Sequence, residues 1–521
     1  MVKVLTPEEA VALIKDEQTL CVEGFNLGVH PHELIYALED RFLKTGTPRN
    51  LTLVYNAGMG NGNGPDGKGY AVNRIAKEGL LKKVIAGHLN LAPALGKLIS
   101  ENKVIAYNLP QGTLSHMYRD AAARKVGTIT SVGLNTFIDP RQDGGKLNAV
   151  TTENINEVIT LDGKEQLFYK RLSLDFCLLR GTYADEKGNI SMEKECLFMD
   201  NLSVAMAVHA NGGTVIVQVE GIVQTASLQP KMVIPGVLVD AVVVVPATKN
   251  MPEVDPGLVD LHIGRVRVPR IDLGAPAPLD DRKIIGRRAA MELFKGAAVN
   301  LGVGMPEQVA LVAGEEGVFE NFTLTVEAGN FGGLPKPVPL FGCSTNVEAI
   351  IPQANQFDFY DGGGLDLAFL GLAQCDQFGD INVSKMGSKI PGCGGFLNIA
   401  ENSRKVIFCG TLTGKGLKTE VRDGKLVIAQ EGQIKKFLNK VDQITFNGRN
   451  AIARRQPVMF ITERAVFDLT PEGLRLLEVA PGINVEKDIL ANLEFRPIIA
   501  DDLKLMDARI FRDELMGGIA Q

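Results

Sequence analysis

The sequence lacks several features that would point to particular protein classes. It has no tryptophan, only six histidines and seven cysteines in 521 residues, and no Cys-x-x-Cys spacing. The one close histidine pair, His30-Pro31-His32, has no cysteine or further histidine nearby, so we expect no metal site. An odd number of cysteines without paired spacing is typical of a reduced compartment. A nucleophilic role is open to each cysteine, but we expect small buried side chains.

Long apolar runs and dense basic runs are also missing. The most apolar stretch, Val237–Ala247, contains Asp240, whereas a transmembrane helix needs about 20 apolar residues. The first residues lack the apolar core of a signal peptide. The net charge is −6, and no Lys/Arg cluster suggests a surface for nucleic acid. We therefore expect a cytoplasmic protein that binds neither membranes nor nucleic acid.

Short β-branched runs alternate with helical stretches along the chain. Strands are predicted at Leu51–Tyr55, Thr323–Val326 and Lys405–Cys409, and helices at Pro31–Phe42 and Asp281–Phe294. This alternation predicts an α/β fold with mostly parallel, buried sheets. Apolar residues make up 45% of the chain, so its length predicts two or three domains with sizeable cores.

The two halves of the chain share three local patterns in the same order. The first-half segments are Asn26–Val29, Leu51–Gly58 and Asp175–Ile190, and their partners are Asn300–Val303, Phe322–Gly329 and Asp366–Ile381. One match could arise by chance, whereas three in order indicate that an α/β domain was duplicated.

A proline-rich stretch separates the halves. Residues 246–280 contain six prolines and show little periodicity, which is typical of a linker. We therefore predict an N-terminal α/β domain at 1–245, a linker at 246–280, and a C-terminal α/β domain at 281–521.

The repeat reveals one chemical difference between the halves. Asn56 and Glu327 occupy equivalent positions, each where a β-run ends in Ala-Gly. Ligands of open α/β sheets bind at the carboxyl ends of the strands. Glu327 is therefore a candidate functional carboxylate, and the alternative is a solvated glutamate in a turn.

Two glycine-dense turns follow in the second half, at Asp361–Asp366 and Gly392–Phe396. Glycine lets backbone N–H groups approach a ligand closely, so such turns can bind phosphate or stabilise an oxyanion. Tight turns without a ligand are the alternative. The sequence contains no P-loop, no G-x-G-x-x-G pattern at Gly58–Gly64, and no G-x-S-x-G pattern around a serine, so nucleotide binding and α/β-hydrolase chemistry are disfavoured.

Taken together, these residues resemble the class I coenzyme A transferases, most closely the single-chain propionate and acetate CoA-transferases. The likeness covers nearly the whole chain. It is carried by Leu109–Leu114, Thr136–Arg141, Val299–Pro306 and Gln356–Asp366, with Gly392–Phe396 and Phe408–Thr411 adding to it.

The resemblance implies an enzyme that moves CoA between a short-chain acyl-CoA and a free short-chain carboxylate. The two α/β halves would correspond to the α and β subunits of two-chain relatives. Glu327 would be the catalytic residue and would form a glutamyl-CoA thioester in a ping-pong reaction. Acyl-CoA and small carboxylic acids would be its partners, no cofactor would be tightly bound, and the protein would form homo-oligomers.

The resemblance also implies roles for residues around Glu327. The implied oxyanion or CoA-binding residues are Asn300, Gly302, Gly304, Gly392, Gly394 and Gly395, and the implied substrate-pocket residues are Asn26, Gln111 and Ala328. Ala328 departs from the family pattern, which has a serine or asparagine after the glutamate. Val29 stands where the N-terminal signature of the family has a glycine.

Three other functions remain open from the sequence. A thioesterase would use the same site and admit water, a non-catalytic module of the same fold would only bind a small molecule, and a structural scaffold would need no site. Glu327 together with Gly392–Phe396 favours the transferase, and a covalent CoA adduct would discriminate between these functions.

Overall fold

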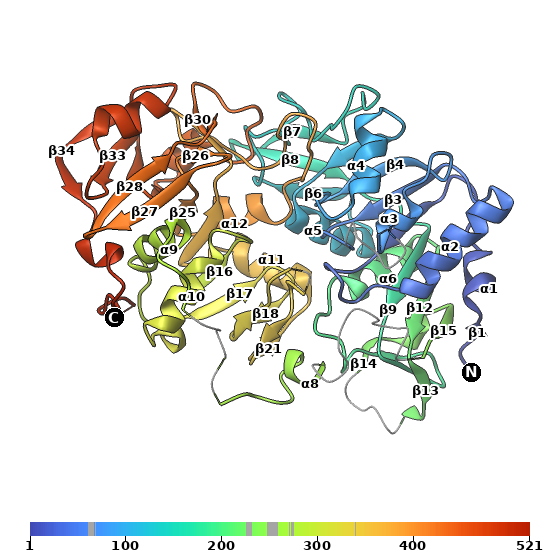
Figure 1. Cartoon of the computed structure of the whole chain (residues 1–521). Coiled ribbons are helices and arrows are strands. Elements are labelled where there is room, and N and C mark those ends of the chain that lie inside the picture. The colour runs from blue at the N-terminus through green and yellow to red at the C-terminus, as the bar shows by residue number, and fades with distance from the viewer. Residues whose placement is uncertain are drawn as a thin grey trace. The chain divides into compact units, whose positions relative to one another are not determined.

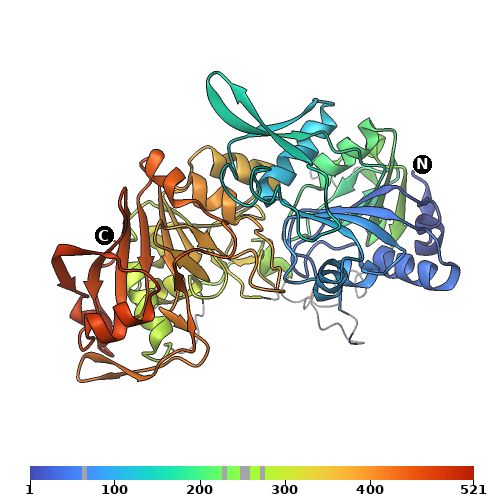
Figure 2. The ribbon, with the colours of Figure 1, turned by 90° about the horizontal axis from the view of Figure 1, so that it is seen from above.

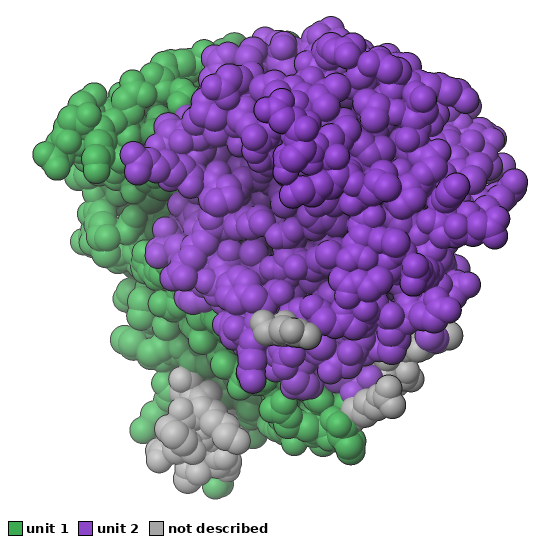
Figure 3. Space-filling model, turned by 90° about the vertical axis from the view of Figure 1, so that its left-hand side faces the viewer, with its two compact units in different colours: residues 1–269, 326–358, 387–398 green, residues 270–325, 359–386, 399–521 purple. Residues whose placement is uncertain are grey.

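The computed structural model describes residues 1–60, 67, 69–225, 232–246, 259–269, 271, 276–338 and 340–520. The chain divides into two compact units, which Figure 3 shows in different colours. Unit 1 comprises Met1–Pro269, Val326–Asp358 and Gly387–Asn398, and unit 2 comprises Arg270–Thr325, Phe359–Met386 and Ile399–Gln521.

The compact units are not continuous in the sequence. Val326–Asp358 and Gly387–Asn398 belong to unit 1, so Glu327 and the glycines at 392–395 lie with the N-terminal residues rather than in a separate C-terminal unit. The boundaries at 1–245, 246–280 and 281–521 describe the duplication in the sequence and stay a prediction. In the predicted linker, residues 247–258, 270 and 272–275 lie outside the described residues, and α8 (Val259–His262) is a short helix in the described part.

Unit 1 is built on an eight-stranded sheet in which every neighbouring pair of strands is parallel. Figure 1 shows β9, β12 and β15 of this sheet side by side. From edge to edge the strands are β1 (Val4–Leu5), β15 (Ala241–Val244), β12 (Thr214–Val219), β9 (Phe176–Arg180), β2 (Thr19–Val22), β3 (Leu51–Tyr55), β4 (Leu81–Ala86) and β5 (Ile105–Asn108).

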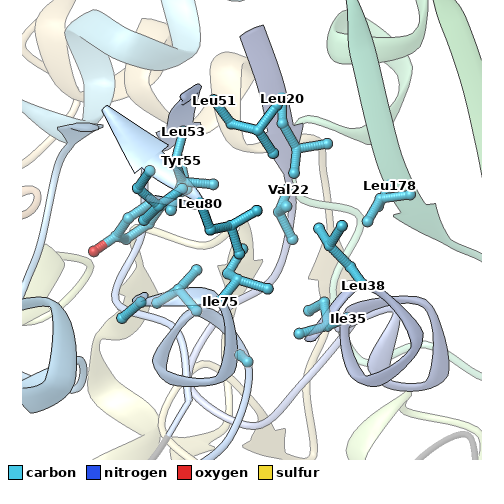
Figure 4. Close-up of a cluster of buried hydrophobic side chains, with 14 of the residues drawn as sticks. Leu20, Val22, Ile35, Leu38, Leu51, Leu53, Tyr55, Ile75, Leu80 and Leu178 are labelled. Atoms are coloured by element: carbon cyan, nitrogen blue, oxygen red, sulfur yellow. The ribbon is translucent and has the colours of Figure 1, made fainter. Parts of the chain in front are cut away.

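Helices cover this sheet with their apolar faces. In α2 (His32–Thr45) the buried residues Leu34, Ile35 and Leu38 follow the spacing of one helix face. Figure 4 shows Ile35 and Leu38 pointing toward Val22 and the neighbouring strands. Each such side chain contributes roughly 1.5–3 kcal/mol when it is fully buried. The other helices that begin and end in unit 1 are α1 (Pro7–Val11), α3 (Val72–Ile75), α4 (Pro93–Ser100), α5 (Gln111–Ala122), α6 (Asn201–Ala210) and α8.

Smaller sheets are attached to unit 1. One contains β6 (Gly127–Thr130) and the antiparallel hairpin of β7 (Asn156–Leu161) and β8 (Lys164–Lys170), which stands out as a teal ribbon in Figure 2. The remaining strands of the unit are β10 (Tyr183–Asp185), β11 (Ile190–Ser191), β13 (Gly221–Val223), β14 (Met232–Ile234), β18 (Asn330–Phe331), β19 (Leu334–Pro335), β20 (Ser344–Thr345) and β21 (Ala349–Ile350).

Unit 2 has its own sheet, parallel at one side and mixed at the other. Its strands run in the order β17 (Thr323–Val326), β16 (Ala298–Leu301), β22 (Leu367–Gly371), β25 (Lys405–Cys409), β31 (Val458–Ile461), β32 (Ala465–Thr470), β33 (Gly473–Val479) and β34 (Ile498–Leu505). The helices α9 (Asp281–Ala290), α10 (Glu307–Glu315) and α13 (Gly448–Ala453) belong to this unit, whereas α11 (Gln353–Asp361) and α12 (Phe396–Asn402) each begin in unit 1 and end in unit 2.

Short strands complete unit 2. They are β23 (Gln374–Asp376), β24 (Ile381–Asn382), β26 (Thr413–Gly414), β27 (Lys418–Arg422), β28 (Lys425–Gln430), β29 (Ile434–Lys435) and β30 (Phe437–Leu438).

The predicted duplication is confirmed by the strand order. The order β3-β2-β9-β12-β15 in unit 1 has the same connectivity as β17-β16-β22-β25-β31 in unit 2. In both units the aspartate that begins the third repeated pattern accepts a hydrogen bond from the start of the neighbouring strand: Thr19 N–H donates to Asp175 at 2.8 Å, and Ala298 N–H donates to Asp366 at 2.9 Å.

The third repeated pattern also contains the same turn in both halves. Asp185 accepts hydrogen bonds from the N–H groups of Lys187 and Asn189, and Asp376 accepts them from residues two and four positions later. Gly188 and Gly379 follow with φ of 87° and 74°, a backbone region that favours glycine. The shared Asp and Gly therefore encode one turn that is used twice.

The seven cysteines are free and buried, as predicted. Burial raises the pKa of Cys409 to about 12, so its thiol is not ionised at neutral pH. The described residues contain no group of three or more His, Cys, Asp or Glu side chains that could hold a metal ion. Among the helices that the structure describes, none has both the length and the apolar content that a membrane span requires.

Candidate functional site

Glu327 directly follows β17, in the turn that leads to β18. β17 runs parallel to β16, so this turn lies at the carboxyl end of a parallel strand, where ligands of α/β sheets bind. Asn56 follows β3 in the same way. The predicted placement of both residues at strand ends is confirmed.

Gly329 allows the turn to pass close to a neighbouring segment. Its φ is +117°, and a Cβ atom at this position would lie 2.0 Å from the backbone oxygen of Ile351. The carbonyl of Gly329 accepts a hydrogen bond from Ile351 N–H at 2.9 Å, and its own N–H donates to Val326 at 2.9 Å. The turn that carries Glu327 is thereby fixed from both sides, which explains the glycine in Glu327-Ala328-Gly329.

Ala328 does not face solvent. It is fully buried in an apolar cluster that also contains Ala57, the equivalent alanine of the first half, and Val326. Phe25 and Phe341 belong to the same cluster, with their ring centroids 5.9 Å apart. A methyl group fits this environment, whereas a serine hydroxyl would need a hydrogen-bond partner there. Any effect of Ala328 on substrate preference stays a prediction and would act through packing.

The environment of Glu327 favours the neutral form of its carboxyl group. Glu327 is partly buried, and desolvation raises its pKa to about 7, opposed only in part by a hydrogen bond from its own N–H. No lysine or arginine of the described residues is ion-paired with it. Near neutral pH the carboxyl group is therefore about half ionised.

The loop Gly392–Gly395 is buried and held by backbone contacts within unit 1. Gly394 N–H donates to the carbonyl of Gly87 at 2.8 Å, so this group is already bonded. Gly395 lies just before α12, and within the described residues its N–H has no bonded acceptor. Of the two predicted oxyanion donors, Gly395 is therefore the one whose N–H is available.

Gln111 ties this loop to the start of α11. Its backbone N–H donates to the carbonyl of Gly394 at 2.9 Å, and its side-chain Nε2 donates to Oε1 of Gln353 at 3.0 Å. Gln111 is 2% exposed. The residue predicted to line the substrate pocket therefore makes contacts that hold the loop.

Gln353 also belongs to a buried polar network that sequence reasoning missed. Its Nε2 donates to Oγ of Ser115 at 2.9 Å and to Oδ2 of Asp200 at 3.0 Å. Asn56 Nδ2 donates to the same Asp200 oxygen at 2.6 Å. Burial raises the pKa of Asp200, while hydrogen bonds from Ser115, Gln353 and Ala354 oppose that rise. These contacts join segments far apart in the sequence, and no local motif marks them.

A second buried acid lies beside Asp200. Glu23 accepts a hydrogen bond from the backbone N–H of Asp200 at 3.4 Å, and its Oε1 has no partner within the described chain. Burial raises the pKa of Glu23 well above its usual value, and the neighbouring Asp200 charge adds to this shift. Both causes favour the neutral form of Glu23, which disfavours two adjacent buried charges.

Asn26 is held by hydrogen bonds within the fold. It adopts a left-handed backbone conformation with φ of 49°, and its Nδ2 donates to the carbonyl of Phe341 at 2.7 Å. Its backbone bonds to Gly58 and Gly60. These contacts fix the residues around the apolar cluster, and the predicted contact of Asn26 with substrate stays a prediction.

The remaining predicted residues lie in unit 2. Asn300 is buried, and its Nδ2 donates to the carbonyl of Thr325 and to the hydroxyl of Tyr360, both at 3.2 Å. Gly302 N–H donates to Phe369 at 2.8 Å. Gly304, with φ of 93°, has open space beside it. Asn300 and Gly302 are thus bonded within the fold, and their roles toward CoA stay predictions.

We expect Gly329→Ala to be strongly destabilising. The positive φ alone costs an alanine about 1–2 kcal/mol, and the close approach of Ile351 forces a further backbone shift. Gly317→Ala is the matched control, because Gly317 also has a positive φ but no atom near its Cβ position. The apparent melting temperature should fall much further for Gly329→Ala, and equal losses would contradict the described turn.

We expect Glu327→Gln to stabilise the protein in a pH-dependent way. The pKa of Glu327 is raised from 4.5 to about 7 on folding, so the folded state holds the proton more tightly. Ionisation then costs stability increasingly between pH 4.5 and 7, up to about 3 kcal/mol, and the cost stays constant above that. The gain in apparent melting temperature from Glu327→Gln should be absent below pH 4.5 and largest above pH 7. A gain independent of pH would refute the pKa shift.

Comparison with known proteins identifies coenzyme A transferases as relatives of this chain. The family model for coenzyme A transferase matches residues 4–245. The chain is 45% identical to the acetate CoA-transferase YdiF of Escherichia coli K12, covering 99% of this chain and 96% of that protein. It is 44% identical to the caffeate CoA-transferase of Acetobacterium woodii, covering 99% of both.

A solved structure matches over the whole fold. The acyl-CoA transferase YdiF of E. coli O157:H7, in a thioester complex with CoA, has a TM-score of 0.92 and 44% identity, and the match covers 99% of this chain and 98% of that one. Identity at this level over nearly the full length identifies the kind of enzyme. The chain therefore belongs to the coenzyme A transferase family and is an enzyme of that kind.

Proposed function

We propose that the enzyme transfers CoA from a short-chain acyl-CoA to a free short-chain carboxylate through a CoA thioester of Glu327. The observation that carries this proposal is the carboxyl group of Glu327 itself. It stands at a strand end, no lysine or arginine of the described chain is bonded to it, and burial raises its pKa to about 7. The 44%-identical YdiF structure, which is described as a thioester complex with CoA, gives independent support.

The proposed reaction proceeds in two half-reactions. The carboxylate of Glu327 attacks the thioester carbonyl of acyl-CoA, giving a mixed anhydride and releasing CoA thiolate. The thiolate then attacks the glutamyl carbonyl, which gives glutamyl-CoA and the free acid. A second carboxylate reverses these steps and leaves as a new acyl-CoA. The energy of the thioester is kept throughout, so the exchange needs no ATP, and the kinetics are ping-pong.

Each attack creates a tetrahedral oxyanion that needs hydrogen-bond donors. The N–H of Gly395 is our candidate, because that of Gly394 is already bonded to Gly87. One such donor typically contributes about 3 kcal/mol to the transition state. Water must also be excluded while the anhydride and thioester exist, and the buried surroundings of Glu327 suit this requirement.

The pair of acids that exchange CoA is set by the size of the acyl pocket. The relatives are named for acetate and for caffeate, which differ greatly in size. We propose short-chain acids, and a panel of acetate, propionate and caffeate with one acyl-CoA donor tests this choice. A cytoplasmic location and a homo-oligomeric state also stay predictions.

Incubation with acyl-CoA and no acceptor should trap CoA on the peptide that contains Glu327. Mass spectrometry of the digested protein reads the adduct, and borohydride reduction should fix the altered glutamate. Glu327→Ala should form no adduct and lose transfer activity by at least about a thousandfold. Asn56→Ala, at the equivalent strand end, should be far milder.

The fate of the adduct separates the transferase from a thioesterase. Added carboxylate should discharge it and yield an equal amount of new acyl-CoA. Decay at the same rate with and without acceptor would mean that water is the acceptor. Absence of the adduct under conditions where transfer proceeds would overturn the role of Glu327.

We further expect kcat/KM for acyl-CoA to fall as the pH drops below about 7. Only the carboxylate form of Glu327 is nucleophilic, and its pKa is raised to about 7. The value should therefore drop about tenfold per pH unit below the pKa and level off above it. Binding of an unreactive thioether analogue of acyl-CoA over the same pH range separates this titration from that of the CoA phosphates. A flat profile down to pH 5 would contradict the raised pKa.

A further inference from the structure

We propose that Asp200 and Gln353 are positioning residues. They hold the Glu327 turn and the Gly392–Gly395 loop in the relative positions that catalysis requires. This inference rests on the proposed function, because it assumes that Glu327 is the nucleophile. Neither residue belongs to the segments that carry the family resemblance, and neither stood among the predicted site residues.

Asp200 is the centre of the network. It is 1% exposed, and both of its carboxylate oxygens accept hydrogen bonds. Oδ2 accepts from Asn56 and Gln353, and Oδ1 accepts from the backbone N–H of Ala354 at 3.0 Å. The donors come from two segments far apart in the sequence, the end of β3 and the start of α11.

One arm of the network leads to Glu327. Asp200 holds Gln353 and Ala354, and Gln353 N–H also donates to the carbonyl of Met199 at 3.1 Å. Ile351, two residues earlier, donates its N–H to Gly329 in the Glu327 turn. Only Pro352 lies between these anchors, and its ring restricts the backbone. A shift at Asp200 is therefore transmitted to the Glu327 turn.

The other arm leads to the glycine loop. Gln353 Oε1 accepts from Gln111 Nε2, and Gln111 N–H donates to the carbonyl of Gly394. Gln353 thus uses its oxygen toward the loop and its nitrogen toward Asp200. A single side chain links the nucleophile turn to the loop that carries the candidate oxyanion donor.

A carboxylate in this place is costly, which argues for a function. Burial of an ionised carboxyl costs several kcal/mol unless donors surround it, and an apolar side chain could fill the space without that cost. The arrangement supplies those donors from the segments that must be aligned. Catalysis depends on such alignment, since a displacement of about 1 Å can slow a reaction by about a hundredfold.

A donor–acceptor swap tests the proposal. In Asp200→Asn the new amide nitrogen can take the place of Oδ2, where it faces the amide nitrogen of Gln353, which is also a donor. In the flipped orientation the amide nitrogen takes the place of Oδ1, and the hydrogen bond from the Ala354 N–H is lost. In Gln353→Glu two carboxyl groups meet. When both substitutions are combined, the new amide at position 200 can donate to the new carboxylate at position 353. That carboxylate still accepts from Gln111. Both arms are then restored once the Asn56 amide, which donates to the same Asp200 oxygen in the wild type, turns its own oxygen toward position 200.

The readout is single-turnover formation of the Glu327 adduct, measured per folded enzyme over a range of acyl-CoA concentrations. We expect each single variant to lower the limiting rate by about 10–100-fold while the half-saturating concentration changes less than about threefold. The double variant should recover to within about fivefold of wild type. Rate losses that multiply in the double variant, or wild-type rates in both singles, would overturn the proposal.

Two substitutions on α11 distinguish a positioning role from a general folding defect. Gln353 and Gln356 are both fully buried, and Gln356 has no hydrogen-bond partner for either side-chain atom within the described chain. Gln353→Leu should slow adduct formation, whereas Gln356→Leu should leave the rate within about twofold. Equal rates in these two variants would show that the network does not position the site.

The outcomes also separate this inference from the proposed function. If wild-type enzyme forms no adduct on Glu327, the proposed mechanism itself fails. If wild type forms the adduct and the network variants form it at the same rate, the mechanism stands and only the positioning role fails.

Discussion

The hydrogen bonds to the buried carboxylate of Asp200 bring together segments that are far apart in the sequence. A buried charge without such donors would cost several kcal/mol, so the segments from β3 and α11 are bound to a common centre. Gln353 extends this centre to Gln111 and the glycine loop. Burial and the neighbouring Asp200 raise the pKa of Glu23, which disfavours a second charge in the same space. We propose that the position of the Glu327 turn depends on this arrangement of donors and one acceptor.

Duplication explains why the two strand ends now differ. Asn56 and Glu327 follow equivalent strands, and the alanines after them pack in the same apolar cluster. A carboxylate at position 56 would lie against Asp200, whereas the amide of Asn56 donates to it at 2.6 Å. The first copy thus supplies a donor to the network, and the second keeps the carboxyl group for which we propose a role in the chemistry. If the proposed mechanism holds, one ancestral turn serves structure in one half and reactivity in the other.

Much of the fold and part of the site could be predicted from the sequence. Alternating strands and helices, the repeated Asp185 and Asp376 turns, and Glu327 at a strand end all follow from local patterns. The contacts of Asp200 and Gln353 could not be predicted, because a buried acid cannot be told from a surface acid in the sequence until its distant donors are known. The sequence also did not show that each compact unit is made of several separate stretches of the chain, since contacts rather than chain order define the units.

The raised pKa of Glu327 would reconcile two demands on the carboxylate nucleophile that we propose. An ordinary glutamate is fully ionised at neutral pH but weakly basic and well hydrated, and both properties limit its attack on a thioester. Burial makes it more basic, yet a larger shift would leave little carboxylate to react. A pKa near 7 keeps about half of the groups ionised while raising their basicity, which is close to the optimum for a group acting at neutral pH. Because no lysine or arginine in the described part of the chain is bonded to Glu327, desolvation sets this balance. The positioning network that we propose would fix the Glu327 turn without adding a positive charge.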